Sequence, residues 1–503
     1  MSGQGANKAA IRCQLEFGRD DQLSDRSTRR FVSVLERPSR FSRARPVTDL
    51  IADGRRLARQ LNPIAQLPRD SRGAHLAEIC QPYLQLVDAD TRDEHTGIRL
   101  MDVWRYFRHT WANRYRSTPG RNLFYLIRDA GQPNHPVMAI TALGNAVMQL
   151  TSRDAQLGWT RDRLATLIQD GVVTGPEILQ AFKTRIAEDL SQIYCDDLPI
   201  PADIPERISD EILDRLLLIE QRSSTARTTA LKDPQDSDLT ARRIADISVV
   251  DLAEMARTPL FRAKRARTAR ELLRAYRSIQ DAPSFDALAS TSEGHWTIGA
   301  AIRQLKKRYS ATAMMEITVC GAVAPYNHLL GGKLACLMMA SPDIRRDYAE
   351  RYGDVYSIIA SQMAGRPIFK EPCLVYLGTT SLYSDRSSQY NRVRLPAGSV
   401  DGQDTSVYYQ SIGKSEGFGS PNLSQETEAA LVELTDTVRD YRNVNFVFGE
   451  GQSPKLRQLR EGFAALGLNR ADVLNHGAQR LVYALALASN APRYLLGVDP
   501  EPS

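Results

Sequence analysis

The chain has 503 residues, of which 42% are hydrophobic and 25% charged. These proportions suit a globular chain that can bury a core, and they exclude wholesale disorder, a collagen-like sequence and a bare disulfide scaffold. Basic side chains outnumber acidic ones by 65 to 59, and the net charge of +6 permits nucleic-acid contact without implying it.

About 55 of the 65 basic residues are Arg, whose planar fork of donors suits phosphate and carboxylate, although GC-rich coding also enriches Arg. The first residues, MSGQGANK, hold no apolar core of signal-peptide length. The apolar runs at 334–340 and 481–488 are shorter than the about 20 residues of a membrane helix. We therefore expect a cytoplasmic protein with no membrane partner. The six Cys are scattered and no His pairs with a Cys at zinc-finger spacing, so we expect reduced thiols and no metal site.

The first two parts of the chain are expected at residues 1–94 and 95–159. Residues 1–94 are predicted to form an Arg-rich arm, up to about residue 45, and then helices near 47–90. Residues 95–159 hold a helix from Met101 to Trp111 and two strand-like runs, LFYLIR and VMAITAL. The turn-rich connector AGQPNHP between these runs predicts an antiparallel hairpin.

Residues 160–290 have the pattern of a helical insertion. A capping box, Thr174 with Glu177, opens a helix whose apolar residues recur every three or four positions, and a second helix follows a Pro-rich break. Residues 291–503 return to mixed structure, with strands expected at 314–323, 373–378 and 407–412. The fold class is therefore predicted to be α/β (α+β), with a mixed sheet, a helical N-terminal region and a large helical insertion.

Paired glycines lie between the strand expected at 314–323 and the helix that follows it. Glycines that open a helix let backbone N–H groups approach an anion, and the helix dipole favours the negative charge. The spacing fits neither a Walker loop nor a dinucleotide fingerprint, and tight helix packing is the alternative explanation. The residues that would hold a phosphorylated cofactor here are Asn327, His328, Gly331, Gly332 and Lys333.

The order of hairpin, long strand, glycine loop and helix resembles the acetyltransferase-like (GNAT) fold, in which the loop after the central strand wraps a pyrophosphate. This resemblance implies an acetyltransferase-like sheet core and a coenzyme A-like ligand. The sequence departs from that family's loop at the final small position, where Lys333 stands. A side chain of this size obstructs the close approach of coenzyme A, so the loop favours the fold and disfavours acyl transfer.

An Arg-rich helix is expected near the end of the insertion. Arg267, Arg270, Arg274 and Arg277 follow one another in steps of three, four and three, which predicts one cationic stripe on a helix face. Such a stripe can neutralise the phosphates of a polyanion, and the alternative is a solvated face whose like charges repel one another. The residues of this helix expected to contact nucleic acid are Arg262, Lys264, Arg265, Arg267, Arg270, Arg274 and Arg277.

Two further segments carry side chains suited to nucleic acid. The run 379–392 is rich in hydroxyl and amide groups and has Tyr faces on which bases can stack, although an ordinary surface loop has the same composition. The turn-rich segment 114–122 adds further Arg residues. The side chains expected to line one groove or two adjacent ones are Arg116, Arg121, Tyr383, Gln389, Asn391 and Arg392.

The sequence assigns no catalytic residue, and whether the protein is an enzyme stays open. Cys320, His328 and Cys336 flank the glycine loop, and a Cys–His dyad is an open alternative because a nucleophile needs its base within hydrogen-bond reach. The chain contains no Gly-x-Ser-x-Gly elbow, no His-Glu-x-x-His motif and no deaminase signature.

Several long stretches resemble the DruA family of the Druantia anti-phage defence system. The stretches span most of residues 95–500 and lie at 100–122, 134–144, 327–342, 351–366, 379–394 and 449–497. The resemblance implies a role in bacterial defence, beside partners that include a large helicase-like protein. It transfers no catalytic residue.

Three functions follow as hypotheses. The first is an anti-phage component that binds DNA or RNA through Arg-rich surfaces on an acetyltransferase-like core. The second is an acyl- or nucleotidyl-type transferase that uses a phosphorylated cofactor at residues 331–333. The third is a non-catalytic assembly subunit that docks other defence proteins.

Overall fold

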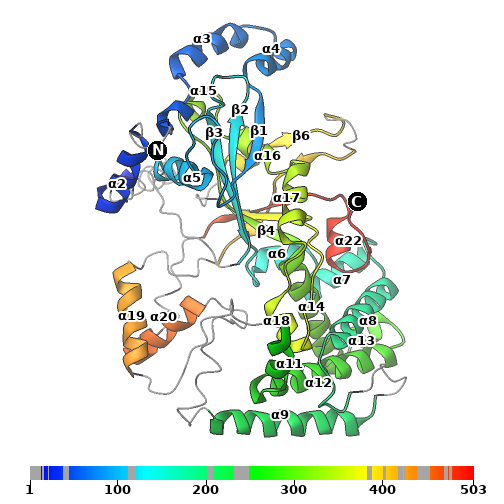
Figure 1. Cartoon of the computed structure of the whole chain (residues 1–503). Helices are drawn as coiled ribbons and strands as arrows, with labels where there is room; N and C mark the ends of the chain where they lie inside the picture. The colour runs from blue at the N-terminus through cyan, green and yellow to red at the C-terminus, as the bar shows by residue number, and fades with distance from the viewer. Residues whose placement is uncertain are drawn as a thin grey trace.

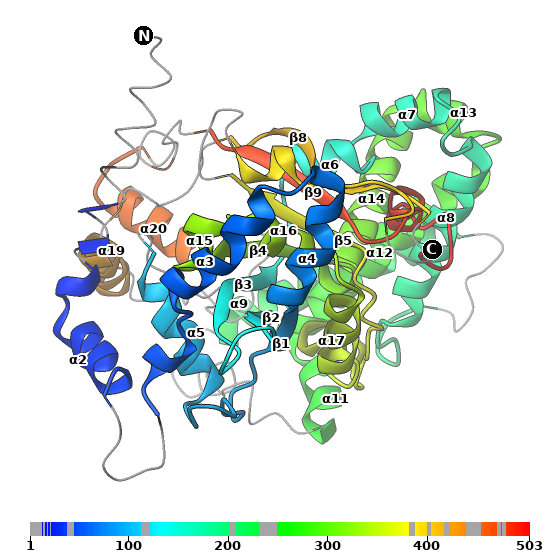
Figure 2. The ribbon, with the colours of Figure 1, turned by 90° about the horizontal axis from the view of Figure 1, so that it is seen from above.

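The computed structural model describes residues 13, 16–17, 19–20, 22–37, 45–111, 120–200, 208–230, 249–381, 388–399, 404–416, 423, 425–438, 454–469, 474 and 479–503. A central sheet separates helices α3 and α4 at one end from a large group of helices at the other (Figure 1). The view from above places α3 and α4 over the end of the sheet (Figure 2).

Seven strands form one mixed sheet in the order β1-β2-β3-β4-β5-β9-β8. These strands are Pro82–Leu86 (β1), Asn122–Asp129 (β2), Val137–Asn145 (β3), Met314–Ala322 (β4), Tyr376–Thr380 (β5), Gln410–Lys414 (β8) and Leu481–Ala486 (β9). Strands β4 and β5 are parallel, whereas the other neighbouring pairs of this sheet are antiparallel. The predicted hairpin is confirmed as β2 and β3, and the expectation of a mixed sheet is confirmed with it.

The segment expected as one strand at 407–412 is divided between two sheets. Val407–Tyr408 (β7) pairs with Arg394–Leu395 (β6), and the chain then enters β8. Tyr409, between the two strands, is buried with its ring 4.8 Å from the ring of Tyr390. Because this side chain enters the core, the register of β7 does not continue into β8.

The helices cover both faces of the sheet and lie at both of its ends. They are Arg26–Leu35 (α2), Gly54–Ala65 (α3), Arg72–Ile79 (α4), Leu100–His109 (α5), Thr151–Gln156 (α6), Arg161–Gln169 (α7), Gly175–Ser191 (α8), Asp210–Ala230 (α9), Val249–Arg257 (α11), Pro259–Asp281 (α12), Phe285–Ala289 (α13), Ser292–Thr312 (α14), Tyr326–Leu329 (α15), Lys333–Met338 (α16), Pro342–Tyr352 (α17), Ile358–Ala364 (α18), Gln425–Val438 (α19), Pro454–Ala465 (α20) and Ala491–Leu495 (α22). Short 3-10 turns lie at Val47–Leu50 (η1), Arg69–Ser71 (η2) and Gln389–Arg392 (η4).

Alternate residues of the strands face different cores, as the two-residue period of a strand requires. Tyr125 of β2 packs with α16 and α17, whereas its neighbour Leu126 packs with α5 and η1. In β4, Ile317 and Val319 are two residues apart and would share a face in a regular strand. An irregularity in the pairing with β3 lies between them, and they enter different cores. The sheet is therefore covered on both faces.

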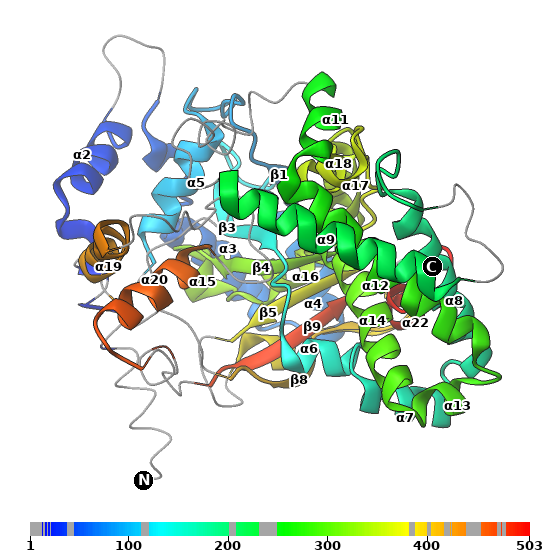
Figure 3. The same cartoon turned by 90° about the horizontal axis from the view of Figure 1, so that it is seen from below.

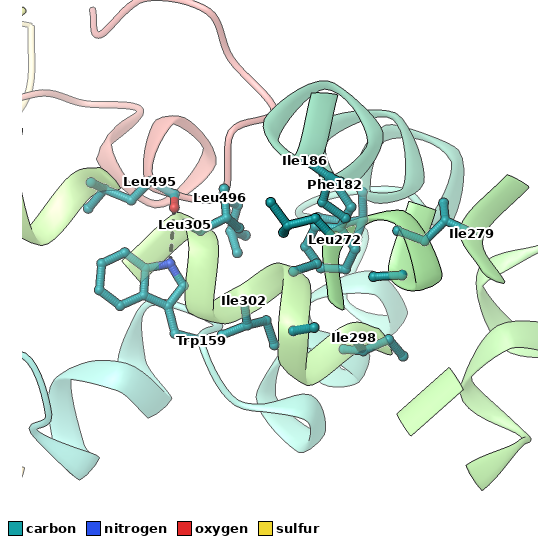
Figure 4. Close-up of a cluster of buried hydrophobic side chains, with 14 of the residues drawn as sticks. Trp159, Phe182, Ile186, Leu272, Ile279, Ile298, Ile302, Leu305, Leu495 and Leu496 are labelled. Atoms are coloured by element: carbon teal, nitrogen blue, oxygen red, sulfur yellow. Dashed lines mark hydrogen bonds between the residues drawn. The ribbon is translucent and has the colours of Figure 1, made fainter. Parts of the chain in front are cut away.

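The described residues of 160–290 are mainly helical, with turns between α7 and α8 and after α8. Figure 4 shows their side chains in one apolar cluster with α14 and α22, and the indole Nε1 of Trp159 donates a 3.0 Å hydrogen bond to the carbonyl of Leu495. The predicted capping box is confirmed, because Thr174 and Glu177 exchange hydrogen bonds at the start of α8. The insertion and the sheet therefore share a hydrophobic core.

Two expectations for the N-terminal part need correction. The arm expected up to about residue 45 includes a helix, α2, whose Phe31 ring lies 4.4 Å from the guanidinium of Arg105 on α5. The region expected to be helical up to residue 90 also contains β1, at the edge of the sheet. Within the described ranges, no helix has both the length and the apolar composition needed to cross a bilayer.

Candidate functional site

The predicted cationic stripe lies on α12, where the helix packs against α9 and α14. Figure 3 shows α9 lying along α12. Arg270 contacts Glu220 of α9 at 2.8 Å, Arg277 contacts Asp210 at 2.7 Å, and the Nε of Arg274 donates to Glu293 of α14 at 2.7 Å. Arg267 contacts Glu271, four residues along the same helix, at 3.1 Å.

The four arginines of the stripe are therefore paired: neighbouring helices supply a carboxylate to Arg270, Arg274 and Arg277, and α12 itself supplies Glu271 to Arg267. Arg265 has no exposed surface, and two hydrogen bonds join it to Asp197, which also lies 3.2 Å from Arg262. Lys264 lies over the ring of Phe261. Charges paired in this way mainly hold helices together. Contact of this helix with nucleic acid stays a prediction.

The structure brings together two segments that were predicted separately. The amide Nε2 of Gln389 donates a 3.2 Å hydrogen bond to the carbonyl of Cys320 on β4. A Cβ added to Gly332 would lie 2.8 Å from the Oε1 of Gln389, so the end of the Gln389 side chain lies close to the Gly332 backbone. Gly331 has φ of 76°, a conformation that favours glycine. The segment 388–392 therefore lies directly on the glycine loop.

Exposed polar and cationic side chains belong to the segments that form this contact. The side chains of Asn327, His328, Lys333 and Arg392 are exposed, and so is that of Arg394 on β6. In the described part of the chain, none of Lys333, Arg392 and Arg394 lies within 4.0 Å of a carboxylate. η4 packs on α16, so Arg392 and Lys333 belong to neighbouring elements. The positive charge at this end of the sheet is therefore not paired with carboxylates among the described residues, whereas the positive charge of α12 is.

The parallel strands β4 and β5 separate before β4 reaches the glycine loop. β4 and β5 share three paired positions, from Met314–Tyr376 to Glu316–Gly378. Beyond them, the carbonyl of Ile317 accepts a 3.1 Å hydrogen bond from the hydroxyl of Thr379. Side chains from the 379–392 segment thus donate hydrogen bonds to carbonyls of β4. In a continued sheet these carbonyls would accept from the backbone of a neighbouring strand.

Glu316 lies where this pairing ends. Its register partners are Gly144 on β3 and Gly378 on β5, and a Cβ on Gly378 would lie 2.5 Å from its Oε2. Its Oε1 is shielded from solvent and has no hydrogen-bond partner among the described residues. Burial raises the pKa of Glu316 to about 7, and the charge of Arg153 opposes this rise. A buried carboxyl with such a pKa can take or give a proton near neutral pH.

A buried ionic cluster borders Glu316. Arg153 has no exposed surface and contacts Asp154 at 2.8 Å, while the ammonium of Lys306 lies 2.5 Å from the other oxygen of Asp154. The Tyr376 hydroxyl lies 3.4 Å from Gln156, and burial, followed by the charge of Glu316, raises the pKa of Tyr376. The carboxyl of Glu316 therefore has the guanidinium of Arg153 and the hydroxyl of Tyr376 in its surroundings.

The remaining residues predicted to contact nucleic acid lie in different parts of the chain's structure or outside the described ranges. Arg116 and Tyr383 lie outside the described residues. Asn391 accepts a 3.0 Å hydrogen bond from the hydroxyl of Tyr483. Arg121 lies beneath α17, where it donates to the Tyr348 hydroxyl and, at 3.2 Å, to the carbonyl of Ser310. Arg121 therefore does not share a surface with Arg392.

The open question of a Cys–His dyad is answered by the neighbours of Cys320. Its sulfur lies 3.8 Å from that of Cys336, and this contact, together with burial, raises its pKa. His328 is exposed on α15. A thiol held protonated by another thiol is a poor nucleophile, so the described contacts do not support the dyad. Among the described residues, no three His, Cys, Asp or Glu side chains are grouped as metal ligands.

Sequence reasoning missed Glu316. A signal existed for it, because it interrupts the apolar run MMEITVCGAV.

Comparison with known proteins gives one family. The family model described as Druantia protein DruA matches residues 59–181 and 296–497, together more than half of the chain. The curated Druantia protein DruA of Escherichia coli (strain UMEA 4076-1) is 34% identical over 192 residues, which are 38% of this chain and 43% of that protein. The chain thus aligns with less than half of the length of this relative. No solved structure matches the chain.

Proposed function

Because the chain belongs to the DruA family, we propose that it is a component of a Druantia anti-phage system and that it contacts nucleic acid at the glycine-loop end of its sheet. The observation that carries this proposal is the contrast in charge pairing. The arginines of α12 contact carboxylates, whereas Lys333, Arg392 and Arg394 are exposed cations with none nearby in the described ranges. Unpaired surface cations are what a phosphate backbone binds.

The proposed core is acetyltransferase-like. The hairpin β2–β3 lies beside the long central strand β4 in the sheet, and the chain after β4 passes through α15 and the glycines 331–332 into α16. The proposal also draws support from the parallel β4–β5 pair, which diverges beside the glycine loop. A helicase-like partner from the same system is part of the proposal through family membership.

The experiment compares nucleic-acid affinity across salt concentrations. In the test variant, Lys333, Arg392 and Arg394 are each changed to Gln. The control variant makes the same change of net charge at the exposed residues Arg222, Arg227 and Arg303. We expect the slope of log K against log salt to fall by about 2 to 3 in the test variant and to stay unchanged in the control. Equal losses in both variants, or an affinity of the wild type that ignores salt, would overturn the proposal.

A second candidate function is group transfer with Glu316 as the proton acceptor. The observation that favours it is the buried, unpartnered Oε1 of Glu316 at the divergence of β4 and β5. A coenzyme A-like ligand does not fit the glycine loop as it stands, because Gln389 occupies the space beside Gly332. The test is thermal unfolding with coenzyme A and with nucleotides, since a ligand at 100 times its Kd adds about 2.7 kcal/mol. Absence of any stabilisation would remove this candidate.

A further inference from the structure

Two histidines meet where the connector of the β2–β3 hairpin lies against the loop between β1 and α5. His135 belongs to the connector and His95 to the loop, and both side chains are half-buried. The centroids of their rings are 4.9 Å apart, and the ring planes are inclined by 57°. The two imidazoles are therefore in direct contact, with part of their surface open to solvent.

A hydrogen bond orients one of the two rings. The Nδ1 of His135 lies 3.0 Å from the hydroxyl oxygen of Tyr83 on β1. Because Nδ1 makes this contact, Nε2 is the ring nitrogen that remains for a ligand. When Nε2 binds a cation, Nδ1 carries the proton and donates it to the Tyr83 oxygen. Histidines that bind a metal are commonly held by such a polar partner at their other nitrogen.

A single buried ion pair fixes the backbone of both histidines. Arg128 of β2 and Asp93 are almost completely buried and lie 2.7 Å apart. Asp93 accepts a 3.2 Å hydrogen bond from the backbone N–H of His95. Arg128 donates to the carbonyl of His135 and, at 3.1 Å, to that of Asn134. The two loops are thus joined through one charge pair, which holds the rings beside each other.

The backbone of the connector is strained at the histidine. Asn134 and His135 have φ of 61° and 45°, a left-handed conformation that residues other than Gly seldom adopt. Strain of this kind persists only where surrounding contacts hold it, and it is concentrated at functional sites. The bonds of Arg128 to both carbonyls are such contacts. The position of the His135 ring is therefore set before any ligand binds.

The spacing of the rings fits one metal ion bound between them. Zinc–nitrogen bonds are about 2.0 to 2.1 Å long, so two imidazoles on one tetrahedral ion have ring centroids roughly 5 Å apart. The observed separation of 4.9 Å agrees with this value. Imidazole suits zinc, nickel and copper ions, whereas magnesium and calcium prefer oxygen ligands. We propose that His95 and His135 bind one divalent transition-metal ion, and that Tyr83 is a positioning residue for His135.

Two histidine ligands leave coordination positions open to water or to an oxygen of a bound molecule. Catalytic zinc sites keep such an open position, whereas structural sites are closed by four protein ligands. Both ligands are neutral when they bind, so the ion keeps its positive charge. The site does not depend on the function proposed for residues 331–333 and 392–394, because it shares no residue with them.

Isothermal titration calorimetry of the full chain with zinc chloride tests the proposal, with magnesium chloride as the comparison. Because Zn²⁺ also binds thiolates, the exposed Cys13 is changed to Ser in each protein tested. We expect His95→Asn and His135→Asn each to weaken Zn²⁺ binding at least tenfold, or about 1.4 kcal/mol. His75→Asn and His328→Asn are matched controls at exposed histidines of α4 and α15, and they should keep the affinity.

Tyr83→Phe tests the positioning role without removing a ligand. It should still bind one Zn²⁺ per chain, with an affinity about tenfold lower. A hydroxyl that only stabilises the turn would instead lower the Tm of the metal-free protein and leave the Zn²⁺ affinity unchanged. This variant keeps the aromatic ring, so it also serves if a histidine variant does not fold, which circular dichroism shows.

The remaining outcomes count against the site. A wild-type chain that binds no Zn²⁺, or that binds Mg²⁺ equally well, would overturn the proposal. So would histidine variants that keep the wild-type affinity, because the ion would then be bound elsewhere. The variant with Gln at Lys333, Arg392 and Arg394 should bind Zn²⁺ as the wild type does, which separates this site from the proposed nucleic-acid contact.

Discussion

The guanidinium of Arg265 binds both carboxylate oxygens of Asp197, at 2.7 Å and 3.0 Å, although the two residues lie 68 positions apart in the sequence. The same guanidinium donates to the carbonyl of Ala256 at the end of α11. Arg265 has no exposed surface. A residue that the sequence places among candidate phosphate ligands therefore joins α12 to α11 and to the segment after α8.

Arg265→Met should lower the free energy of unfolding by about 3 kcal/mol, because it leaves Asp197 and two backbone acceptors without their donor. Urea unfolding at neutral pH measures the change. Arg267→Gln is the matched control, since Arg267 is largely exposed and its single-helix ion pair contributes about 0.5 kcal/mol or less. Equal effects of the two variants would contradict the structural role of Arg265.

Glu316→Gln should change how stability depends on pH. Burial raises the pKa of Glu316 to about 7 in the folded protein, whereas the unfolded chain has the ordinary value of 4.5. The folded state therefore holds a proton that the unfolded state releases. The stabilisation is complete below the unfolded pKa and is lost as pH rises through the folded one.

Between pH 5 and pH 8 the wild type should thus lose up to about 3 kcal/mol relative to Glu316→Gln, which does not titrate. Urea unfolding of both proteins at each pH gives the comparison. If the wild type and Glu316→Gln show the same dependence of unfolding free energy on pH, the Glu316 carboxyl is exposed to water in solution.

Gly378→Ala should destabilise the protein by about 1 to 3 kcal/mol, because the new Cβ would lie 2.5 Å from the Oε2 of Glu316. In the Glu316→Ala background the cost should fall by about 1 kcal/mol or more, which a double-mutant cycle measures. Gly73→Ala is the control, since a Cβ at Gly73 meets nothing within 4 Å. Additive effects of the two changes would place the carboxyl away from Gly378.

Thr174→Ala should cost about 1 kcal/mol, because the hydroxyl accepts a hydrogen bond from the backbone of Glu177 at the start of α8. Thermal unfolding, monitored by circular dichroism, measures this loss of stability. Thr184→Ala, in the exposed middle of the same helix, should be neutral or slightly stabilising. A Thr174 variant as stable as the wild type would mean that the cap does not hold the helix end.

Local patterns predicted the elements that depend on local physics. The hairpin of β2 and β3 follows from two apolar runs around a turn-rich connector, and the start of α8 follows from Thr174 and Glu177. The division of 407–412 did not follow, because it depends on the burial of Tyr409 against Tyr390. β1 was missed for a similar reason, since it is a short edge strand whose residues are only partly buried.

The sequence by itself determined the periodicity of the helices, the long strand β4, the position of the glycine loop and the resemblance to a family. Only the tertiary structure decided which charges are paired, because each ion pair of α12 with α9 or α14 joins residues that no local pattern connects. It also decided that the Oε1 of Glu316 is shielded from solvent and lacks a hydrogen-bond partner among the described residues. The reason is that charge interactions depend on distance and burial, and both are set by how distant segments pack.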